Sequence, residues 1–138
     1  MELTRRQTMI AAAGAAAVAA MPFRAWAAAD EAIAAFTGGA EVGEGDITLT
    51  APEIAENGNT VPIEVAAPGA EAISVFADGN PVPAVATVTF GPLAAEQMLA
   101  TRIRLAGTQN VIAVARMPDG TFVQTIQEVK VTIGGCGG

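Results

Sequence analysis

The sequence of 138 residues contains no histidine and no tyrosine, and it has one cysteine and one tryptophan. Without histidine, the chain cannot form a Ser-His-Asp triad, a Cys-His dyad or a histidine-ligated copper or zinc site. Carboxylate pairs remain possible by spacing, at Glu53 with Glu56 or at Glu41 with Glu44, but acidic residues in turns are usually solvated surface. Most familiar enzyme sites are therefore excluded, and we predict a protein that is not an enzyme and holds neither a metal nor a cofactor.

Basic residues are also scarce, with seven Lys and Arg against 14 Asp and Glu and a net charge of −7. Loss of the first 27 residues would remove three arginines and one glutamate, which changes the net charge to −9. Such a surface repels nucleic acid, anionic membranes and free anionic small molecules. Arg102 and Arg104 share one face of a predicted strand and could contact an acidic partner, although a solvated or sheet-edge role is more common.

The first 27 residues have the pattern of a signal peptide, with a basic start and an apolar run from Met9 to Met21. Small-residue cleavage sites follow, ending at Ala27 and Ala29. The apolar run of about 13 residues is shorter than the ~20 needed to cross a bilayer. We therefore predict an exported, periplasmic protein with no membrane insertion.

Arg5 and Arg6 lie in the segment from Thr4 to Ile10, which resembles a twin-arginine export signal. The alternative is an ordinary signal peptide, in which the two arginines would only supply the basic start. The apolar run is rich in alanine and weakly hydrophobic, which favours the twin-arginine translocase and export in the folded state.

Removing residues 1–27 leaves about 111 residues, enough for one domain with a modest core. The stretch from Asp30 to Phe36 predicts one short N-terminal helix, with acidic residues in its first turn and Gly38-Gly39 as its stop. We expect the folded domain to span residues 28–133.

From Ile47 onward, turn signals recur about every ten residues and separate short runs rich in Val, Ile and Thr. These runs predict about seven strands, at residues 47–50, 60–65, 73–77, 85–90, 99–105, 111–115 and 123–133. In the last run, Val123, Val129, Val131 and Ile133 fall on one face, so one side of this strand should be buried. The pattern favours an all-β fold, an immunoglobulin-like β-sandwich without the cysteine pair of antibody domains.

The only cysteine, Cys136, lies two residues from the C-terminus in the sequence "GGCGG". The glycines around it can adopt almost any backbone conformation and could enter a channel barely wider than a peptide. These glycines are Gly134, Gly135, Gly137 and Gly138. Residues 134–138, the C-terminal arm, could thus hold the sulfur about 10 Å from the sandwich, as a flexible swinging arm. Nothing nearby activates the thiol, so a partner enzyme would have to do so.

An exported, acidic β-sandwich that ends in "GGCGG" resembles the SoxY family, the sulfur carriers of the thiosulfate-oxidising Sox system. The segments "EAIAAFTGGAEV" and "APEIAENGNTVPIEV" also resemble that family. The resemblance implies that Cys136 carries the sulfur substrate covalently, as a carrier and not as a catalyst. It implies loading of thiosulfate onto the thiol by a c-type haem enzyme, SoxAX. Hydrolysis of the sulfone group by the metal-dependent SoxB and oxidation of the remaining sulfur by the dehydrogenase SoxCD would follow.

The resemblance also implies a partner subunit, SoxZ, which has no signal of its own and would be exported with this chain. The pair is a heterodimer, which a disulfide through Cys136 could double to a heterotetramer. The chain is rich in alanine and valine and has only five Phe, one of them in the signal segment, so the domain has few large residues for its core and we expect it to bury an apolar face against such a partner.

Two other classes of protein remain. A ubiquitin-like sulfur donor also ends in Gly-Gly, but it works in the cytosol, needs no cysteine and has a helix across its sheet. A periplasmic binding or structural module could use Cys136 only to form a covalent dimer.

Overall fold

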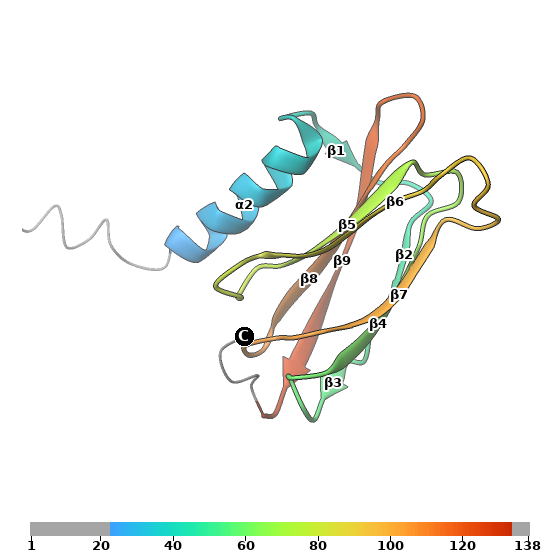
Figure 1. Ribbon diagram of the computed structural model, residues 1–138. Helices are drawn as coiled ribbons and strands as arrows, with labels where there is room; N and C mark the ends of the chain where they lie inside the picture. Colours follow the sequence, from blue (N-terminus) through green and yellow to red (C-terminus); the bar gives the residue numbers. More distant parts are fainter. Residues whose placement is uncertain (1–22, 134–138) are drawn as a thin grey trace, which may run out of the picture.

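The structure is a computed structural model that describes residues 23–133 of the chain (Figure 1). Within this part, one helix and nine strands follow one another. They are α2 (Phe23–Thr37), β1 (Val42–Gly43), β2 (Thr48–Thr50), β3 (Ile54–Ala55), β4 (Val61–Ala66), β5 (Ala72–Ala77), β6 (Ala84–Thr89), β7 (Met98–Ile103), β8 (Gln109–Arg116) and β9 (Phe122–Val131). Among the described residues, no helix has both the length and the hydropathy that crossing a membrane requires.

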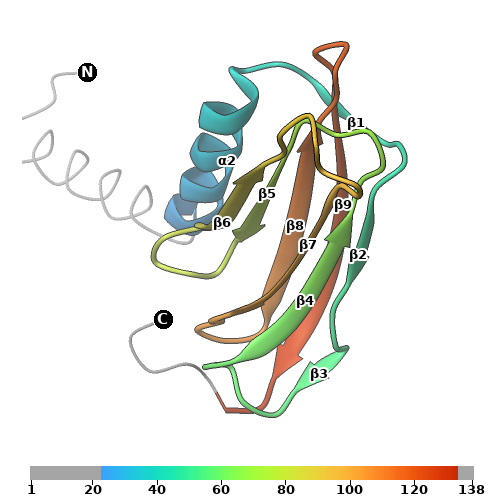
Figure 2. The same ribbon diagram turned by 45° about the vertical axis from the view of Figure 1, so that its right-hand side comes forward.

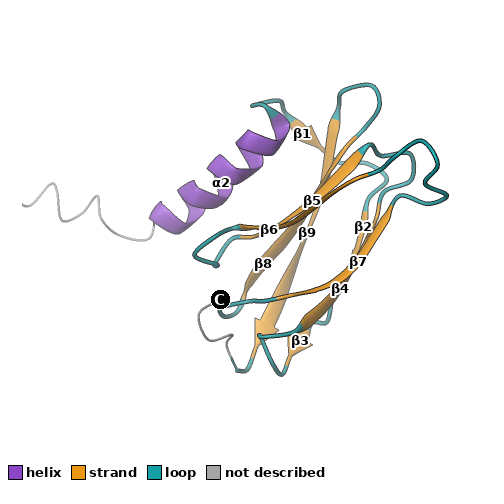
Figure 3. Cartoon of the chain, viewed as in Figure 1, coloured by secondary structure: helices purple, strands orange, loops and turns teal. Residues whose placement is uncertain are grey.

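The strands form two sheets that face each other, and α2 lies on the outer side of the larger one (Figures 2 and 3). The larger sheet has the order β1-β9-β8-β5-β6, and β3 pairs with β9 farther along that strand. Its long strands are antiparallel, whereas β1 and β3 run parallel to β9. The second sheet is antiparallel with the order β2-β4-β7. The predicted immunoglobulin-like sandwich is confirmed.

The space between the two sheets is filled by small apolar side chains. The buried members of this cluster are alanine, valine, isoleucine and one leucine, Leu105, and none of them is aromatic. β-Branched side chains on facing strands interdigitate well, so a core can close without large rings. Val65 and Val129, one from each sheet, are fully buried in this cluster.

A second apolar cluster joins α2 to the outer face of the larger sheet. Phe76 and Phe122 are buried there against Phe36 of the helix. The ring centroid of Phe36 lies 6.3 Å from that of Phe76 and 5.8 Å from that of Phe122. All six residues of β5 are consequently buried, because the strand is covered on both faces.

The end of the predicted helix is confirmed, and its predicted start is wrong. Gly38 and Gly39 have φ angles of 67° and 83°, a left-handed stop in which the Gly39 N–H donates to the Ala34 carbonyl at 3.2 Å. The helix begins at Phe23, so Asp30 lies in its middle and not in its first turn. Alanine has the highest helix propensity, and Ala29, only 3% exposed, extends the face that packs on the sheet.

Two further details differ from the predictions. β1 and β3 were not predicted, because each has only two residues and too short a run to show alternation. Ile133 was expected on the buried face, but it is 66% exposed, since β9 ends at Val131 and the chain then leaves the core. Val123, Val129 and Val131 do pack against the core between the sheets, as predicted.

Candidate functional site

The predicted site residues lie near the two ends of the chain, outside the described residues. They are Cys136, its flanking glycines Gly134, Gly135, Gly137 and Gly138, and the export-signal arginines Arg5 and Arg6. The structure does describe the two residues that precede the C-terminal arm. We call Thr132 and Ile133 the arm root.

The arm root is held against the end of β3 and the segment that follows it. The N–H of Thr132 donates to the Ala55 carbonyl at 3.0 Å, and its hydroxyl donates to the Glu56 carbonyl at 3.1 Å. The N–H of Gly58 donates to the Ile133 carbonyl at 2.8 Å. Successive hydrogen bonds therefore fix the position of the chain as far as Ile133, even though its side chain is exposed.

Gly58 links the arm root to a second segment. Its carbonyl accepts a hydrogen bond from the N–H of Leu105 at 2.8 Å, while its own N–H donates to the Ile133 carbonyl. Gly58 is buried, and one residue thus bridges the end of the described chain and the segment after β7. Arg104, which precedes Leu105, is thereby placed close to the arm root.

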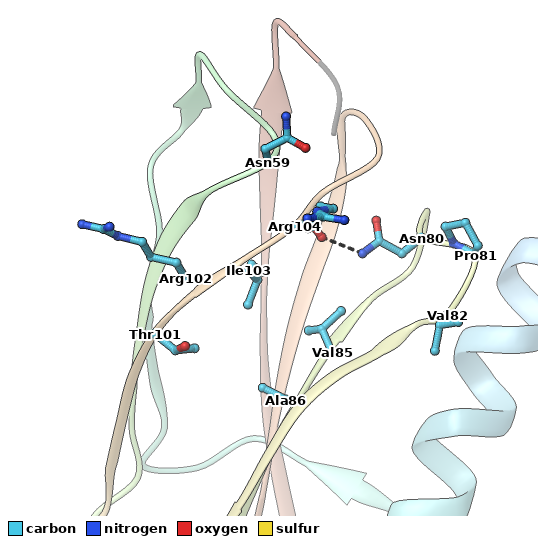
Figure 4. Close-up of a pocket in the computed structure, with 10 residues that line it drawn as sticks. All are labelled: Asn59, Asn80, Pro81, Val82, Val85, Ala86, Thr101, Arg102, Ile103 and Arg104. Atoms are coloured by element: carbon cyan, nitrogen blue, oxygen red, sulfur yellow. Dashed lines mark hydrogen bonds between the residues drawn. The ribbon is translucent and has the colours of Figure 1, made fainter. Parts of the chain in front are cut away.

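A surface cavity of about 530 Å³ opens beside this bridge, between β6 and β7. We call it the arginine cavity, because Arg102 and Arg104 line it together with Asn59, Asn80 and Val85 (Figure 4). β6 and β7 are edge strands of their sheets, so the sandwich is open on this side. The cavity therefore lies at the open edge of the sandwich, and one of its lining residues, Asn59, directly follows Gly58.

Buried amide side chains fix the wall of the arginine cavity. The side-chain N–H of Asn80 donates to the Arg104 carbonyl at 2.7 Å. The side-chain oxygen of Asn80 accepts from the Ala106 N–H at 2.9 Å and from Gln109 Nε2 at 3.0 Å. Oε1 of Gln109 in turn accepts from the Gly79 N–H at 2.9 Å. With both amide groups satisfied, the backbone of Arg104 is held in one place while its side chain remains exposed.

Arg102 and Arg104 differ from Arg116, which forms an ion pair. Arg116 Nε lies 3.4 Å from a carboxylate oxygen of Glu71, and this is the one ion pair among the side chains described for residues 27–133. Arg102 and Arg104 are both exposed and flank the buried Ile103. Arg102 lies in β7, but Arg104 is one residue beyond its end, and Figure 4 shows the two side chains extending in different directions. The predicted common strand face therefore does not bring their guanidinium groups together.

The predicted carboxylate pairs form no site. Glu41, Glu44, Glu53 and Glu56 are all exposed to solvent. Within the described residues, no group of three or more His, Cys, Asp or Glu side chains could hold a metal ion. These acidic residues contribute to the negative surface, as their positions in turns suggested.

Sequence reasoning missed Gly58 and Asn80. Both stand in turn sequences, "ENGN" and "ADGNP", which predict a change of chain direction and nothing more. Their importance comes from partners 24 to 75 positions away in the chain, Arg104 for Asn80 and Ile133 for Gly58. No local pattern in the sequence indicates such partners.

The family model described as sulfur oxidation protein SoxY matches residues 33–136 of this chain. The chain belongs to the SoxY family. The match extends past the arm root to Cys136, so the expected family is confirmed over most of the predicted domain. Membership of the SoxY family makes this a protein of sulfur oxidation.

Solved structures agree with this assignment. The sulfur carrier protein SoxY from Chlorobium limicola f thiosulfatophilum is 41% identical and has a TM-score of 0.66, with 75% of this chain and 96% of that chain covered. Superoxide reductase (neelaredoxin) from Ignicoccus hospitalis is 18% identical with a TM-score of 0.56, over 63% of this chain and 80% of that chain. The second likeness shows the fold alone. No curated protein sequence matches significantly.

Proposed function

We propose that this protein carries intermediates of thiosulfate oxidation covalently on Cys136 and presents them to successive periplasmic enzymes. The observation that carries the proposal is the SoxY match, which extends to residue 136, the position of the only thiol in the chain. The Chlorobium SoxY, described as a sulfur carrier protein, is 41% identical to this chain. The chain supplies the attachment point, and its partners supply catalysis.

The loading step joins two sulfur atoms and releases two electrons. The Cys136 thiol and thiosulfate form a Cys–S–S–SO₃⁻ adduct, with loss of one proton and transfer of two electrons to a c-type haem enzyme of the SoxAX kind. Water then displaces the terminal group as sulfate, catalysed by a SoxB-like hydrolase, and leaves a persulfide on Cys136. A SoxCD-like dehydrogenase, where present, would oxidise the persulfide sulfur.

The structure supports a carrier in which the domain and the arm have separate tasks. The hydrophobic clusters of the domain are formed by residues between 32 and 131. The arm root is hydrogen-bonded to the sandwich, so the domain offers the arm a fixed anchor at Ile133. Glycines on both sides of the thiol would let the adduct turn inside different active sites.

A SoxZ-like subunit is the partner that we propose for the domain. Several large apolar side chains are exposed on the described surface and would be covered by such a subunit. They include Ile54, Val82, Leu93, Met98 and Ile126. A heterodimer of this kind could double through a disulfide at Cys136.

Export through the twin-arginine translocase to the periplasm completes the proposal. Arg5 and Arg6 would direct export of the folded chain. A chain exported in the folded state could carry a bound partner that has no signal of its own. Ala29 is only 3% exposed, whereas Ala27 is exposed. Cleavage after Ala27 would therefore preserve more of the contact between α2 and the sheet than cleavage after Ala29.

The direct test is to incubate the purified mature protein with thiosulfate and a periplasmic extract that contains the Sox enzymes. Intact-mass measurement followed by peptide mapping should find a sulfur-containing mass increase on the peptide with Cys136, removable by reductant. A covalent dimer with no such adduct would favour the binding or structural module instead. An unmodified thiol after turnover of thiosulfate would contradict the proposal.

The glycines can be tested separately from the thiol by replacing Gly135 and Gly137 with valine. β-Branched side chains restrict the backbone and widen the segment, so a narrow enzyme channel should reject the variant. We expect loading by the partner enzyme to slow at least about tenfold, which corresponds to ~1.4 kcal/mol in the barrier. A small thiol reagent in solution should react with both proteins at nearly the same rate. Equal enzymatic loading would show that the glycines do not serve access.

A further inference from the structure

We propose that the arginine cavity is a docking site for the C-terminal arm when Cys136 carries an anionic sulfur group, with Arg104 as the residue that binds the anion. The proposal deepens the carrier function and rests on it. Its occupant is residues 134–138 of the same chain. Docking would depend on the charge of the adduct, so the carrier would hold a sulfonate-bearing adduct and leave an uncharged one free.

The distance along the chain allows this contact. The Ile133 carbonyl is bonded to the N–H of Gly58, and the Gly58 carbonyl is bonded to the N–H of Leu105. Asn59 and Arg104, which line the cavity, are each the direct neighbour of a residue in this chain of bonds. Three residues from Ile133 span about 10 Å, enough for the sulfur of Cys136 to reach the cavity beside its own anchor.

The distribution of charge on the domain favours the arginine cavity over the rest of the surface as the place where an anionic adduct binds. Within the described residues, Arg116 is paired with Glu71, and Lys130 lines a hollow together with Glu53 and Glu128. Arg102 and Arg104 have no carboxylate within ion-pair distance. The remaining surface of the domain is mostly acidic and repels an anion. A guanidinium group presents parallel N–H donors that match the oxygens of a sulfonate.

Because the adduct is tethered to the domain, a weak contact with an exposed arginine is sufficient for docking. An exposed arginine binds a free anion poorly, because water and salt screen the pair. A short flexible tether instead gives an effective concentration in the millimolar range, so the adduct meets Arg104 without diffusing to it. The Asn80 and Gln109 amides hold the Arg104 backbone in position, which lowers the cost of ordering the site.

Of the two arginines, Arg104 is the better placed. Figure 4 shows its side chain between Asn59 and Asn80, whereas Arg102 extends away from the other lining residues. The exposed amide of Asn59 can donate to the same anion. Arg102 would then add only a longer-range attraction.

The test uses two synthetic adducts on the mature full-length protein. Thiosulfonate reagents convert Cys136 into a mixed disulfide with either a sulfonatoethyl group, which is anionic, or a hydroxyethyl group, which is neutral. Amide NMR spectra should show shifts at Asn59 and at residues 104–106 for the sulfonatoethyl adduct and not for the hydroxyethyl adduct. Raising the salt from about 0.1 M to 1 M shortens the Debye length from ~10 Å to ~3 Å and should remove these shifts.

Arg104→Gln should lose the shifts specific to the anionic adduct. The matched control is Arg116→Gln, which removes the same charge at a half-buried arginine whose partner is Glu71, and this variant should keep them. Spectra that otherwise superimpose show that both variants are folded. Equal shifts for the two adducts, shifts at other residues, or shifts that survive Arg104→Gln would overturn the docking site.

These outcomes are independent of the carrier function itself, because the adducts are made without the Sox enzymes. A thiosulfate adduct on Cys136 together with no charge-dependent shift would refute only the docking. Loss of enzymatic loading in Arg104→Gln with no shift in either adduct would assign Arg104 to an acidic partner protein, which also refutes it.

Discussion

Replacing Cys136 with serine is expected to abolish thiosulfate-dependent electron transfer in the reconstituted Sox system. A serine hydroxyl cannot form the sulfur–sulfur bond of the adduct, and the chain has no second thiol. Thermal stability should stay almost unchanged, because serine has nearly the size of cysteine and the hydrophobic clusters of the described residues are formed by positions 32–131. Electron transfer to the haem enzyme and a melting curve of the same preparation would check both parts.

A second variant separates the presence of a thiol from its place. Cys136→Ser combined with Ile133→Cys puts the thiol on the arm root, where the side chain is exposed but the backbone is hydrogen-bonded to Gly58. We expect this protein to react with small thiol reagents and still to support no turnover. Activity retained in the single variant would contradict the carrier function, and activity restored in the double variant would show that the arm is not needed.

Replacing Phe76 with alanine is expected to lower the free energy of unfolding by about 3–5 kcal/mol. Phe76 is 1% exposed and joins β5 to α2 through Phe36, so its removal leaves a cavity on the outer face of the larger sheet. The cluster has few members, and Phe122 lies on β9, two strands away from β5, so it cannot fill the space. Urea unfolding monitored by circular dichroism would measure the loss.

The matched control for this variant is Leu93→Ala, which removes a large apolar side chain that is 97% exposed. It should change the free energy of unfolding by no more than about 0.5 kcal/mol. A similar small change in Phe76→Ala would mean that α2 does not pack on the sheet as described.

Much of the fold follows from local sequence. The alternation of apolar and polar residues in runs such as 61–66 and 122–131, with turn residues between them, indicates strands and their buried faces without any knowledge of partners. Gly38 and Gly39 mark the end of α2, because a left-handed conformation favours glycine. The start of α2 was missed, since the alanines before Asp30 resemble the end of a signal peptide as much as the first turns of a helix.

The sequence by itself determined that the chain is acidic, that it cannot build a histidine site, and that its only thiol stands between glycines at the C-terminus. These are properties of composition and of adjacent residues. Only the tertiary structure decided that Gly58 joins Ile133 to Leu105, and that Asn80 fixes the backbone of Arg104 beside the arm root. Such contacts join segments far apart in the chain, and they depend on how the two sheets pack and leave the edge between β6 and β7 open. Local propensity carries no information about that packing, so the arginine cavity could not be read from the sequence.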